Sequence, residues 1–224
     1  MHPSGVPGET RASCLERHAS SPFFRAEVGA ILSAVGLRPG VRAIDLGCGN
    51  GYLVAAASAT GAFAVGLDRE TETIRSARTL NASGAFLRGS VERLPFRTES
   101  VDAVVAQHVI EHLADPALAV AEWHRVLRAG GRLVVLTPNA RYPDPGVFND
   151  RTHVRIFDPP TLVALLRKRG FQVSKTATIF PYLRGHIAFG LRHRDLLSRI
   201  PPWASSGRSL ICAAQKPLLG APHG

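Results

Sequence analysis

The chain has 224 residues and a formal net charge of +10, and nearly all of its basic residues are arginine. This length fits one domain with a sizeable core, and three widely spaced cysteines argue against a disulfide framework and for a reducing compartment. The positive charge fits either a genome that favours arginine codons or an anionic partner, such as an acidic substrate, a nucleic acid or a membrane surface.

The segment 1–21 is polar and rich in glycine, proline and serine, which predicts a disordered head. It contains no apolar stretch of signal-peptide length, and no uninterrupted apolar run in the sequence is long enough to span a bilayer. We therefore predict a cytoplasmic protein whose folded domain extends over residues 22–217.

Helical and extended patterns alternate along this domain. Apolar residues at helical spacing predict helices over residues 22–35, 50–60, 71–81, 116–127 and 159–169. Short apolar runs predict strands over residues 41–46, 62–67, 85–88, 101–106, 132–136, 171–179 and 209–215. Ala129-Gly130-Gly131 is expected to cap the fourth helix and to form the turn into the next strand.

Strands that alternate with helices pair in parallel through right-handed crossovers. The sequence therefore predicts an α/β fold with a doubly wound, mostly parallel sheet. Because no clear helix separates the last two strands, they are expected to form a C-terminal antiparallel hairpin. Ligands of such folds bind beyond the carboxyl ends of the strands, and the informative residues fall there.

A glycine-rich loop follows the first strand, with the sequence Asp45-Leu46-Gly47-Cys48-Gly49-Asn50-Gly51. Its G-x-G-x-G spacing differs from the G-x-G-x-x-G of the dinucleotide fold, and it lacks the lysine of a P-loop. Glycines in this position let the backbone turn sharply and approach a ligand closely. Asp68 ends the second strand, where a carboxylate can accept two hydrogen bonds from a ribose diol. Together the two features predict a ribose-containing ligand.

The glycine-rich loop and Asp68 resemble the corresponding segments of class I S-adenosylmethionine-dependent methyltransferases. Further matches are Gly66-Leu67-Asp68, Gly89–Phe96, Val109–Leu113 and Val126–Leu133, and the resemblance runs from about Leu37 to Phe171. It implies a seven-stranded sheet, S-adenosylmethionine as the cofactor and methyl transfer as the reaction. The chain is similar to the quinone and natural-product O-methyltransferases within this family.

The resemblance also implies which residues contact the cofactor: Asp45, Gly47, Cys48, Gly49, Gly51, Asp68, Arg69, Ser90, Val91, Glu92 and Gln107. It places Asp45 near the methionine amino group, Asp68 on the ribose and the segment 90–92 around the adenine. The family usually has an acid where this chain has Ser90, and an uncharged hydroxyl makes a weaker hydrogen bond with the adenine amino group. Glu92 is either its substitute or an exposed turn residue.

The segment Gln107-His108-Val109-Ile110-Glu111-His112 contains H-x-x-E-H, the pattern of the inverted zinc peptidases. In a hydrolase this pattern needs a long helix and a further protein ligand. Here it directly follows a buried strand and precedes Asp115-Pro116, which predicts one short turn at the carboxyl end of the strand. We therefore predict no hydrolase zinc site and no resident metal. The turn is expected to line the floor beneath the transferred methyl group, with Gln107 touching the cofactor through its backbone.

A metal-binding interpretation of this turn stays open. His108, Glu111 and His112 are spaced so that they can share one face. The quinone-biosynthesis O-methyltransferases that resemble this segment associate their Glu and His with a divalent metal, but they have an acid where this chain has His108. The alternative roles for Glu111 are a salt bridge and a helix cap.

Methyl transfer to an alcohol or phenol needs a base, and histidine is the usual base near neutral pH. The candidates are His108, His112 and His153. His153 lies in the long loop after the fifth strand, where it either acts as the base or pins the loop. Tyr142, on the same loop, is expected to stack on a substrate ring.

The expected reaction is O-methylation of a small molecule, such as a quinone, a natural product or a sugar. The alternatives are a methyltransferase that acts on RNA or protein, which the basic charge favours, and a non-catalytic S-adenosylmethionine-binding protein. No nucleic-acid-binding module is recognisable. Thr137-Pro138-Asn139 stands where base-amino methyltransferases have N/D-P-P-Y/F/W, which disfavours nucleobase methylation.

An insert over residues 180–208 separates the last two strands and is longer than a hairpin turn requires. Leu183, Ile187 and Leu191 lie at helical spacing within it, and several arginines add positive charge. Three interpretations stay open: an edge helix with a solvated basic face, a lid over the acceptor pocket, and a peripheral contact with an anionic membrane surface.

Overall fold

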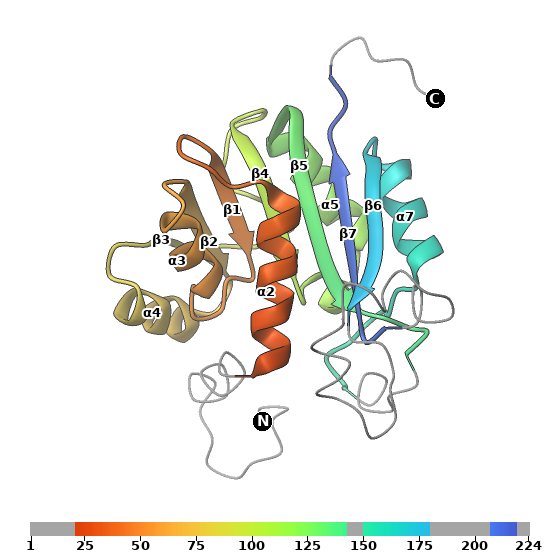
Figure 1. Ribbon diagram of the computed structural model, residues 1–224, viewed down its shortest axis with the longest axis horizontal. Coiled ribbons are helices and arrows are strands. Elements are labelled where there is room, and N and C mark those ends of the chain that lie inside the picture. The colour runs from red at the N-terminus through yellow and green to blue at the C-terminus, as the bar shows by residue number, and fades with distance from the viewer. Residues whose placement is uncertain (1–20, 143–149, 180–206, 219–224) are drawn as a thin grey trace.

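The computed structural model describes residues 21–142, 150–179 and 207–218 (Figure 1). The predicted disordered head and the insert therefore lie outside the described residues, apart from Ser21 and residues 207–208. Within the described parts of the chain, no helix has both the length and the apolar character that crossing a membrane requires. The cytoplasmic location stays a prediction.

Seven strands form one sheet: β1 (Arg42–Leu46), β2 (Phe63–Asp68), β3 (Ala85–Arg88), β4 (Val101–Gln107), β5 (Leu127–Pro138), β6 (Gln172–Ile179) and β7 (Ser209–Gln215). Their order in space is β3-β2-β1-β4-β5-β7-β6 (Figure 1). Strands β1 to β5 pair in parallel, whereas β7 is antiparallel to both of its neighbours, β5 and β6. The predicted α/β class, the seven-stranded sheet and the antiparallel hairpin are confirmed.

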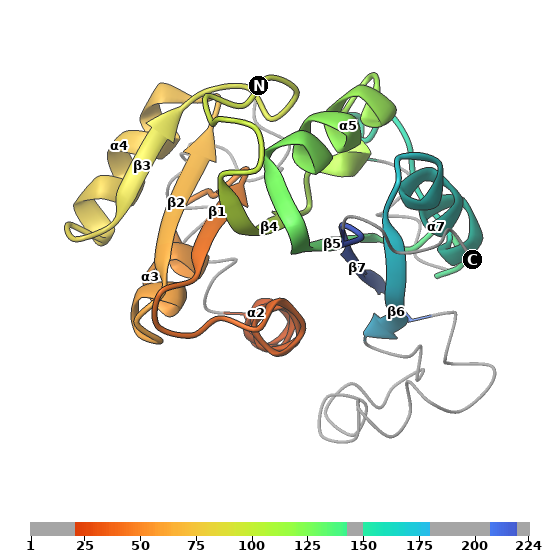
Figure 2. The same ribbon diagram turned by 90° about the horizontal axis from the view of Figure 1, so that it is seen from above.

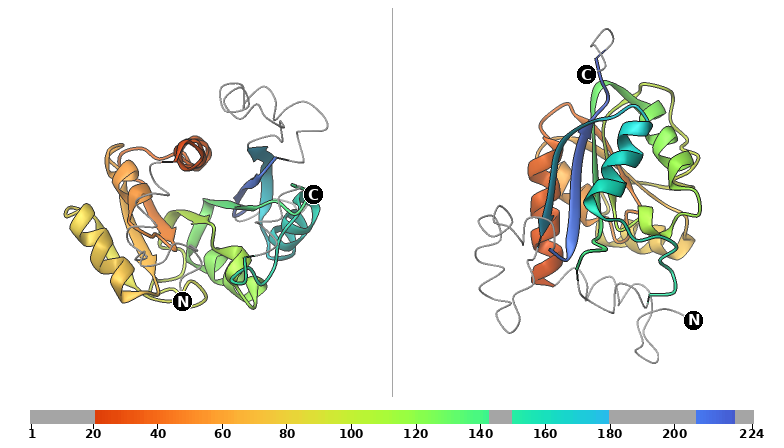
Figure 3. Two further views of the ribbon diagram at one scale, coloured as in Figure 1. Left: turned by 90° about the horizontal axis from the view of Figure 1, so that it is seen from below. Right: turned by 90° about the vertical axis from the view of Figure 1, so that its right-hand side faces the viewer.

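Helices pack on both faces of this sheet. They are α2 (Pro22–Val35), α3 (Tyr52–Ser58), α4 (Thr71–Leu80), α5 (Pro116–Val126) and α7 (Pro159–Lys168). Helices α2 and α3 cover one face, and α5 and α7 cover the other (Figures 2 and 3). Each layer buries its own apolar cluster, with Ile31 and Val54 in the first and Trp123 and Leu166 in the second. The central strands are apolar on both faces because both faces are covered.

Local sequence fixes both ends of helix α2. The Ser21 hydroxyl accepts a hydrogen bond from the Phe23 N–H (3.2 Å), as an N-cap does. Gly36 has a φ of 71°, the left-handed conformation that ends a helix at little cost only when the residue is glycine. The buried residues Ile31 and Val35 anchor the helix on the sheet. This arrangement holds the first turns of α2 near the carboxyl ends of the parallel strands.

The prediction that Ala129-Gly130-Gly131 caps the fourth helix is wrong. Helix α5 ends at Val126, and the fully buried Leu127 already pairs with Val101 as the first residue of β5. Gly130, with a φ of 76°, lies in the irregular stretch before regular pairing begins at Arg132. The strand begins early because Leu127 is buried against a distant partner strand, which the local glycine pattern does not show.

Candidate active site

A cavity of about 180 Å³ lies at the carboxyl ends of β1, β2 and β4. Its lining comes from the glycine-rich loop, the end of β2, the turn after β4, and helices α2 and α3. The lining residues are Phe24, Asp45, Gly47, Cys48, Gly49, Asn50, Tyr52, Leu53, Asp68, Gln107 and His108. A larger depression of about 420 Å³, beside α4 and β3, holds none of the predicted site residues. The smaller cavity is therefore the candidate site.

Backbone geometry explains the glycines at Gly47 and Gly51. Both have left-handed φ angles, of 65° and 76°. A Cβ atom at Gly47 would lie 2.6 Å from Val109 Cγ2, and one at Gly51 would lie 2.5 Å from Phe86 Cζ. The Gly47 N–H donates to the Leu67 carbonyl (2.7 Å), which fixes the loop to the end of β2. The loop thus follows a path that side chains at these positions would block.

Two buried carboxyl groups border the cavity, with Asp45 and Asp68 only 6% and 5% exposed. Burial, and then the negative charge of Asp68, raise the pKa of Asp45 to about 8. Asp68 Oδ1 accepts a hydrogen bond from the Glu70 N–H (2.9 Å). Burial also raises the pKa of the Cys48 thiol, which makes it a poor nucleophile. The buried Nδ2 of Asn50 has no hydrogen-bond partner among the described residues, so the cavity wall offers a donor to a ligand.

Replacing Asp45 by asparagine is expected to stabilise the ligand-free protein relative to the wild type, and increasingly so as the pH rises from about 4 to about 8. The folded protein keeps the Asp45 proton up to about pH 8, whereas the unfolded chain loses it near the ordinary pKa of 3.8. A raised folded-state pKa contributes stability at low pH, and this contribution is lost as the pH rises through that pKa. Chemical denaturation of both proteins at about pH 5 and about pH 8.5 measures the effect. An equal stability difference at the two pH values would contradict a buried, protonated Asp45.

Five of the residues that the resemblance assigns to the cofactor do not line the cavity: Gly51, Arg69, Ser90, Val91 and Glu92. The Arg69 side chain is 80% exposed and pairs with Glu70 (3.3 Å). Ser90 and Glu92 form a local turn, in which the Glu92 N–H donates to the Ser90 hydroxyl (3.2 Å). This geometry supports the turn role for Glu92, and contact of the five residues with a cofactor stays a prediction.

Five residues of the site region that the structure describes are absent from the sequence-based candidates: Phe24, Glu27, Asn50, Tyr52 and Leu53. Phe24 and Tyr52 line the cavity and pack edge to face, with ring centroids 5.7 Å apart. Glu27 of α2 contacts the turn after β4. The available signals are weak: Tyr52 directly follows the last glycine of the loop, and Glu27 is a lone acid between Ala26 and Val28. A single acid on an apolar helix face indicates a buried carboxylate with a partner, but no local pattern names that partner.

A chain of charged groups joins α2 to the turn after β4: a half-buried His108 lies between two buried carboxylates, those of Glu27 and Glu111. His108 Nε2 lies 3.0 Å from Glu27 Oε2, and His108 Nδ1 lies 3.2 Å from Glu111 Oε1. Burial alone would lower the pKa of His108, but the two carboxylates raise it to about 10. Burial alone would raise the pKa of Glu27, but His108 and hydrogen bonds from Ser209 and Gln107 lower it to about 2. His108 is therefore a cation near neutral pH.

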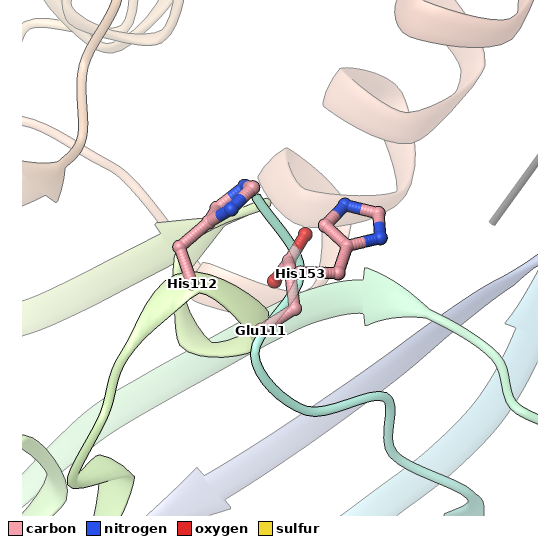
Figure 4. A group of neighbouring side chains, drawn as sticks. All are labelled: Glu111, His112 and His153. Carbon is pink, nitrogen blue, oxygen red and sulfur yellow. The ribbon is translucent and has the colours of Figure 1, made fainter. Parts of the chain in front are cut away.

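The turn after β4 is one short 3₁₀ turn, η1 (Ile110–His112), as predicted. It brings Glu111 and His112 beside His153, and one potential ligand atom from each lies within 4.8 Å of the others (Figure 4). The centroids of the His112 and His153 rings are 5.0 Å apart. His108 contacts the cluster through Glu111 but is not one of its three grouped residues, because its other ring nitrogen faces Glu27. The structure thus joins two of the three predicted histidines.

Hydrogen bonds hold the loop after β5 against this turn. The N–H groups of Val154 and Arg155 donate to the Glu111 carbonyl oxygen (2.8 and 3.1 Å). The Thr137 hydroxyl, at the end of β5, donates to Glu111 Oε2 (2.9 Å). The backbone carbonyl of Glu111 therefore positions the segment that carries His153, while the side chain of Glu111 belongs to the cluster.

Comparison with known proteins gives matches in both sequence and structure. Residues 44–135 match the methyltransferase-domain family. A Mycolicibacterium smegmatis protein, described as a probable S-adenosylmethionine-dependent methyltransferase, is 35% identical over 139 residues, which cover 61% of this chain and 54% of that protein. The demethylmenaquinone methyltransferase of Beutenbergia cavernae is 36% identical over 106 residues, which cover 47% of this chain and 44% of that protein. The chain thus spans about half the length of the curated relatives it matches.

A solved Haloferax volcanii structure, described as a methyltransferase in complex with the activator Trm112, shares the fold. Its TM-score is 0.72 at 21% identity, and the match covers 92% of this chain and 96% of that one. Together with the sheet order and the glycine-rich loop, the sequence matches identify the region of residues 44–135 as a methyltransferase domain of the class I S-adenosylmethionine-dependent type, and the solved structure shows the same fold over the chain. The family cofactor is S-adenosylmethionine, as the resemblance implied.

Proposed function

We propose that this protein transfers a methyl group from S-adenosylmethionine to an oxygen atom of a small molecule. The observation that carries the proposal is the position of the cluster of Glu111, His112 and His153 beside the cavity. His108 lines the cavity and is hydrogen-bonded to Glu111, so His108 connects the cavity to the cluster. An acid and two imidazoles in this place suit an acceptor whose hydroxyl group must be deprotonated.

The chemistry of the cavity fits the cofactor. The Asp68 carboxylate can accept hydrogen bonds from the two ribose hydroxyls, and the unpartnered Asn50 Nδ2 offers a donor. Asp45 would face the positively charged amino group, which favours the ionised carboxylate and lowers its pKa from about 8. When bound, the cofactor supplies an electrophilic methyl group on a positively charged sulfur. Below about pH 8, binding would therefore release a proton from Asp45.

The proposed role of the histidines is to prepare the acceptor oxygen. Methyl transfer is an in-line displacement in which the protein mainly aligns and desolvates the reactants. An alcohol or phenol must in addition lose a proton, and His112 and His153 are the proposed residues for this step. His108 is less suited as a base, because its pKa of about 10 keeps it protonated near neutral pH.

The acceptor class can be tested directly. Similarity to the demethylmenaquinone methyltransferase supports a quinone-like acceptor, and the panel should also hold phenols, sugars, tRNA and protein extracts. The measurement is S-adenosylhomocysteine formation by the purified protein with each candidate. We expect turnover with at least one small hydroxylated compound. Turnover with RNA or protein alone would contradict a small-molecule acceptor, and no cofactor binding in a calorimetric titration would contradict the whole proposal.

Replacing Asp68 by alanine is expected to weaken S-adenosylmethionine binding by about 1.5–3 kcal/mol, the range for hydrogen bonds to a charged group. The variant removes the proposed acceptor of the ribose hydroxyls. Isothermal titration calorimetry measures the change. Glu72→Ala is the matched control, because Glu72 is an exposed acid that pairs only with a surface arginine, Arg75 (2.6 Å), in the described contacts. An unchanged affinity in a folded Asp68→Ala variant would show that the ribose assignment is wrong.

A further inference from the structure

We propose that Glu111, His112 and His153 bind a divalent transition-metal ion at the carboxyl end of β4. The three side chains come from η1 and the loop after β5, and the Glu111 carboxylate lies close to both imidazole rings (Figure 4). One potential ligand atom from each residue lies within 4.8 Å of the other two. Ligand atoms about 2.1 Å from one ion stand roughly 3–4 Å apart, so small side-chain rotations complete the geometry.

His112 has the hydrogen-bond arrangement of a metal-binding histidine. Its Nδ1 lies 2.9 Å from the Thr152 carbonyl oxygen. A carbonyl oxygen only accepts, so Nδ1 carries the proton and donates it, which leaves the lone pair on Nε2. Metal-ligating histidines usually donate their second ring N–H to such a partner, which fixes the tautomer and the ring orientation.

The other two residues of the cluster also have outer partners. Glu111 Oε2 accepts a hydrogen bond from the Thr137 hydroxyl (2.9 Å), and His153 Nε2 lies 3.7 Å from Asp150 Oδ2. Glu111 is fully buried, at 0% exposure. The chain of charged groups sets two carboxylates, of Glu27 and Glu111, against the single imidazole of His108. A cation on the far side of Glu111 would balance the second buried carboxylate.

The ligand set differs from the H-x-x-E-H pattern of the sequence. One ring nitrogen of His108 is hydrogen-bonded to Glu27 and the other to Glu111. His108 therefore orients the metal ligand Glu111 and does not itself bind the ion. The third proposed metal ligand is His153, which lies 41 residues after His112 in the sequence. No spacing rule connects His153 with Glu111 and His112, and the packing of the loop after β5 against η1 brings the three together.

The donor set indicates the class of ion. Two imidazoles and one carboxylate suit Zn²⁺, Mn²⁺, Fe²⁺ or Co²⁺, whereas Mg²⁺ and Ca²⁺ prefer oxygen ligands alone. Three protein ligands leave at least one position for another oxygen atom. If the proposed function holds, that position suits the acceptor oxygen, whose pKa a bound cation would lower.

The test is metal binding by the full chain, independent of any methyl acceptor. The protein is treated with a chelator, dialysed and titrated with Co²⁺ or Zn²⁺ by calorimetry, with the visible absorption of Co²⁺ as a second readout. We expect one ion per chain, weaker binding of Mg²⁺, and at least about tenfold weaker Co²⁺ binding in His112→Ala and His153→Ala. His124→Ala, which removes a histidine of α5, should bind like the wild type.

The absence of saturable Co²⁺ and Zn²⁺ binding would overturn the proposal, as would unchanged binding in both cluster variants. Circular dichroism of each variant confirms that it is folded. Glu111→Gln supplies a further variant that keeps the side-chain shape, and it should also bind Co²⁺ more weakly. Cofactor titration of the same samples separates the two proposals, since S-adenosylmethionine binding without metal binding would overturn the ion site alone.

Discussion

Replacing Glu27 by alanine is expected to lower the free energy of unfolding by about 3–5 kcal/mol, the range for removing one partner of a buried ion pair. Glu27 is 3% exposed. Its carboxylate accepts hydrogen bonds from His108, Gln107 and Ser209. Alanine would leave the His108 cation, whose side chain is only 29% exposed, with one carboxylate instead of two, and two further donors without their acceptor. Chemical denaturation near neutral pH measures the loss.

Three further variants separate the causes of this loss. Glu27→Gln keeps the shape of the side chain but removes its charge. The double variant Glu27→Ala/His108→Ala should cost less than the sum of its parts, because it removes the stranded cation as well. Glu72→Ala, at an exposed surface pair, should change stability by no more than about 0.5 kcal/mol. A loss below about 1 kcal/mol in Glu27→Ala would show that the pair is not charged in the folded protein.

Replacing His112 or His153 by alanine is expected to lower kcat by about 100- to 10,000-fold with an oxygen acceptor, the range for loss of acid–base catalysis. The acceptor oxygen would no longer be prepared for attack, whether the histidines take its proton or hold an ion that does so. Neither residue lines the cavity, so cofactor affinity should stay close to that of the wild type. S-adenosylhomocysteine formation and cofactor titration measure the two effects.

The control for this experiment is His124→Ala, because His124 lies on α5 and packs against Phe171 outside the cluster. The kcat of the His124→Ala variant should match that of the wild type. If both cluster variants lose only a few-fold in kcat, the acceptor is already anionic or its proton leaves by another route. A kcat loss that excess Co²⁺ or Zn²⁺ restores would assign the histidines to the ion, whereas a loss that metal does not restore would assign them to the proton.

Most of the fold could be predicted because its signals are local. Strands β1 and β4 are short apolar runs that helices cover on both faces. Gly36 and Gly170 follow the last turns of α2 and α7 with left-handed φ angles, of 71° and 85°. The start of β5 could not be predicted in this way, because the pairing of Leu127 with Val101 depends on a strand elsewhere in the chain.

The candidate site likewise has a part that local sequence predicts and a part that depends on distant partners. Asp45, the glycines and Asp68 lie on adjacent strand ends, so their proximity follows from a parallel sheet. The shared face proposed for His108, Glu111 and His112 assumes right-handed helical geometry. His108 instead has a φ of 53°, and its ring lies between Glu27 and Glu111. A left-handed residue breaks the helical spacing rule, and sequence spacing cannot identify Glu27 on α2 as the partner of its side chain.

Among the described strands β7 comes last in the sequence, yet it lies inside the sheet between β5 and β6. On the ribosome, β6 therefore emerges before β7, the strand with which it pairs. Ser209, the first residue of β7, also donates to Glu27, which precedes it by 182 residues. Closure of so long a loop is slow compared with the pairing of neighbouring elements. The contact between Ser209 and Glu27 can thus form only after β7 has emerged, whereas Gln107 and His108, the other partners of Glu27, emerge before it.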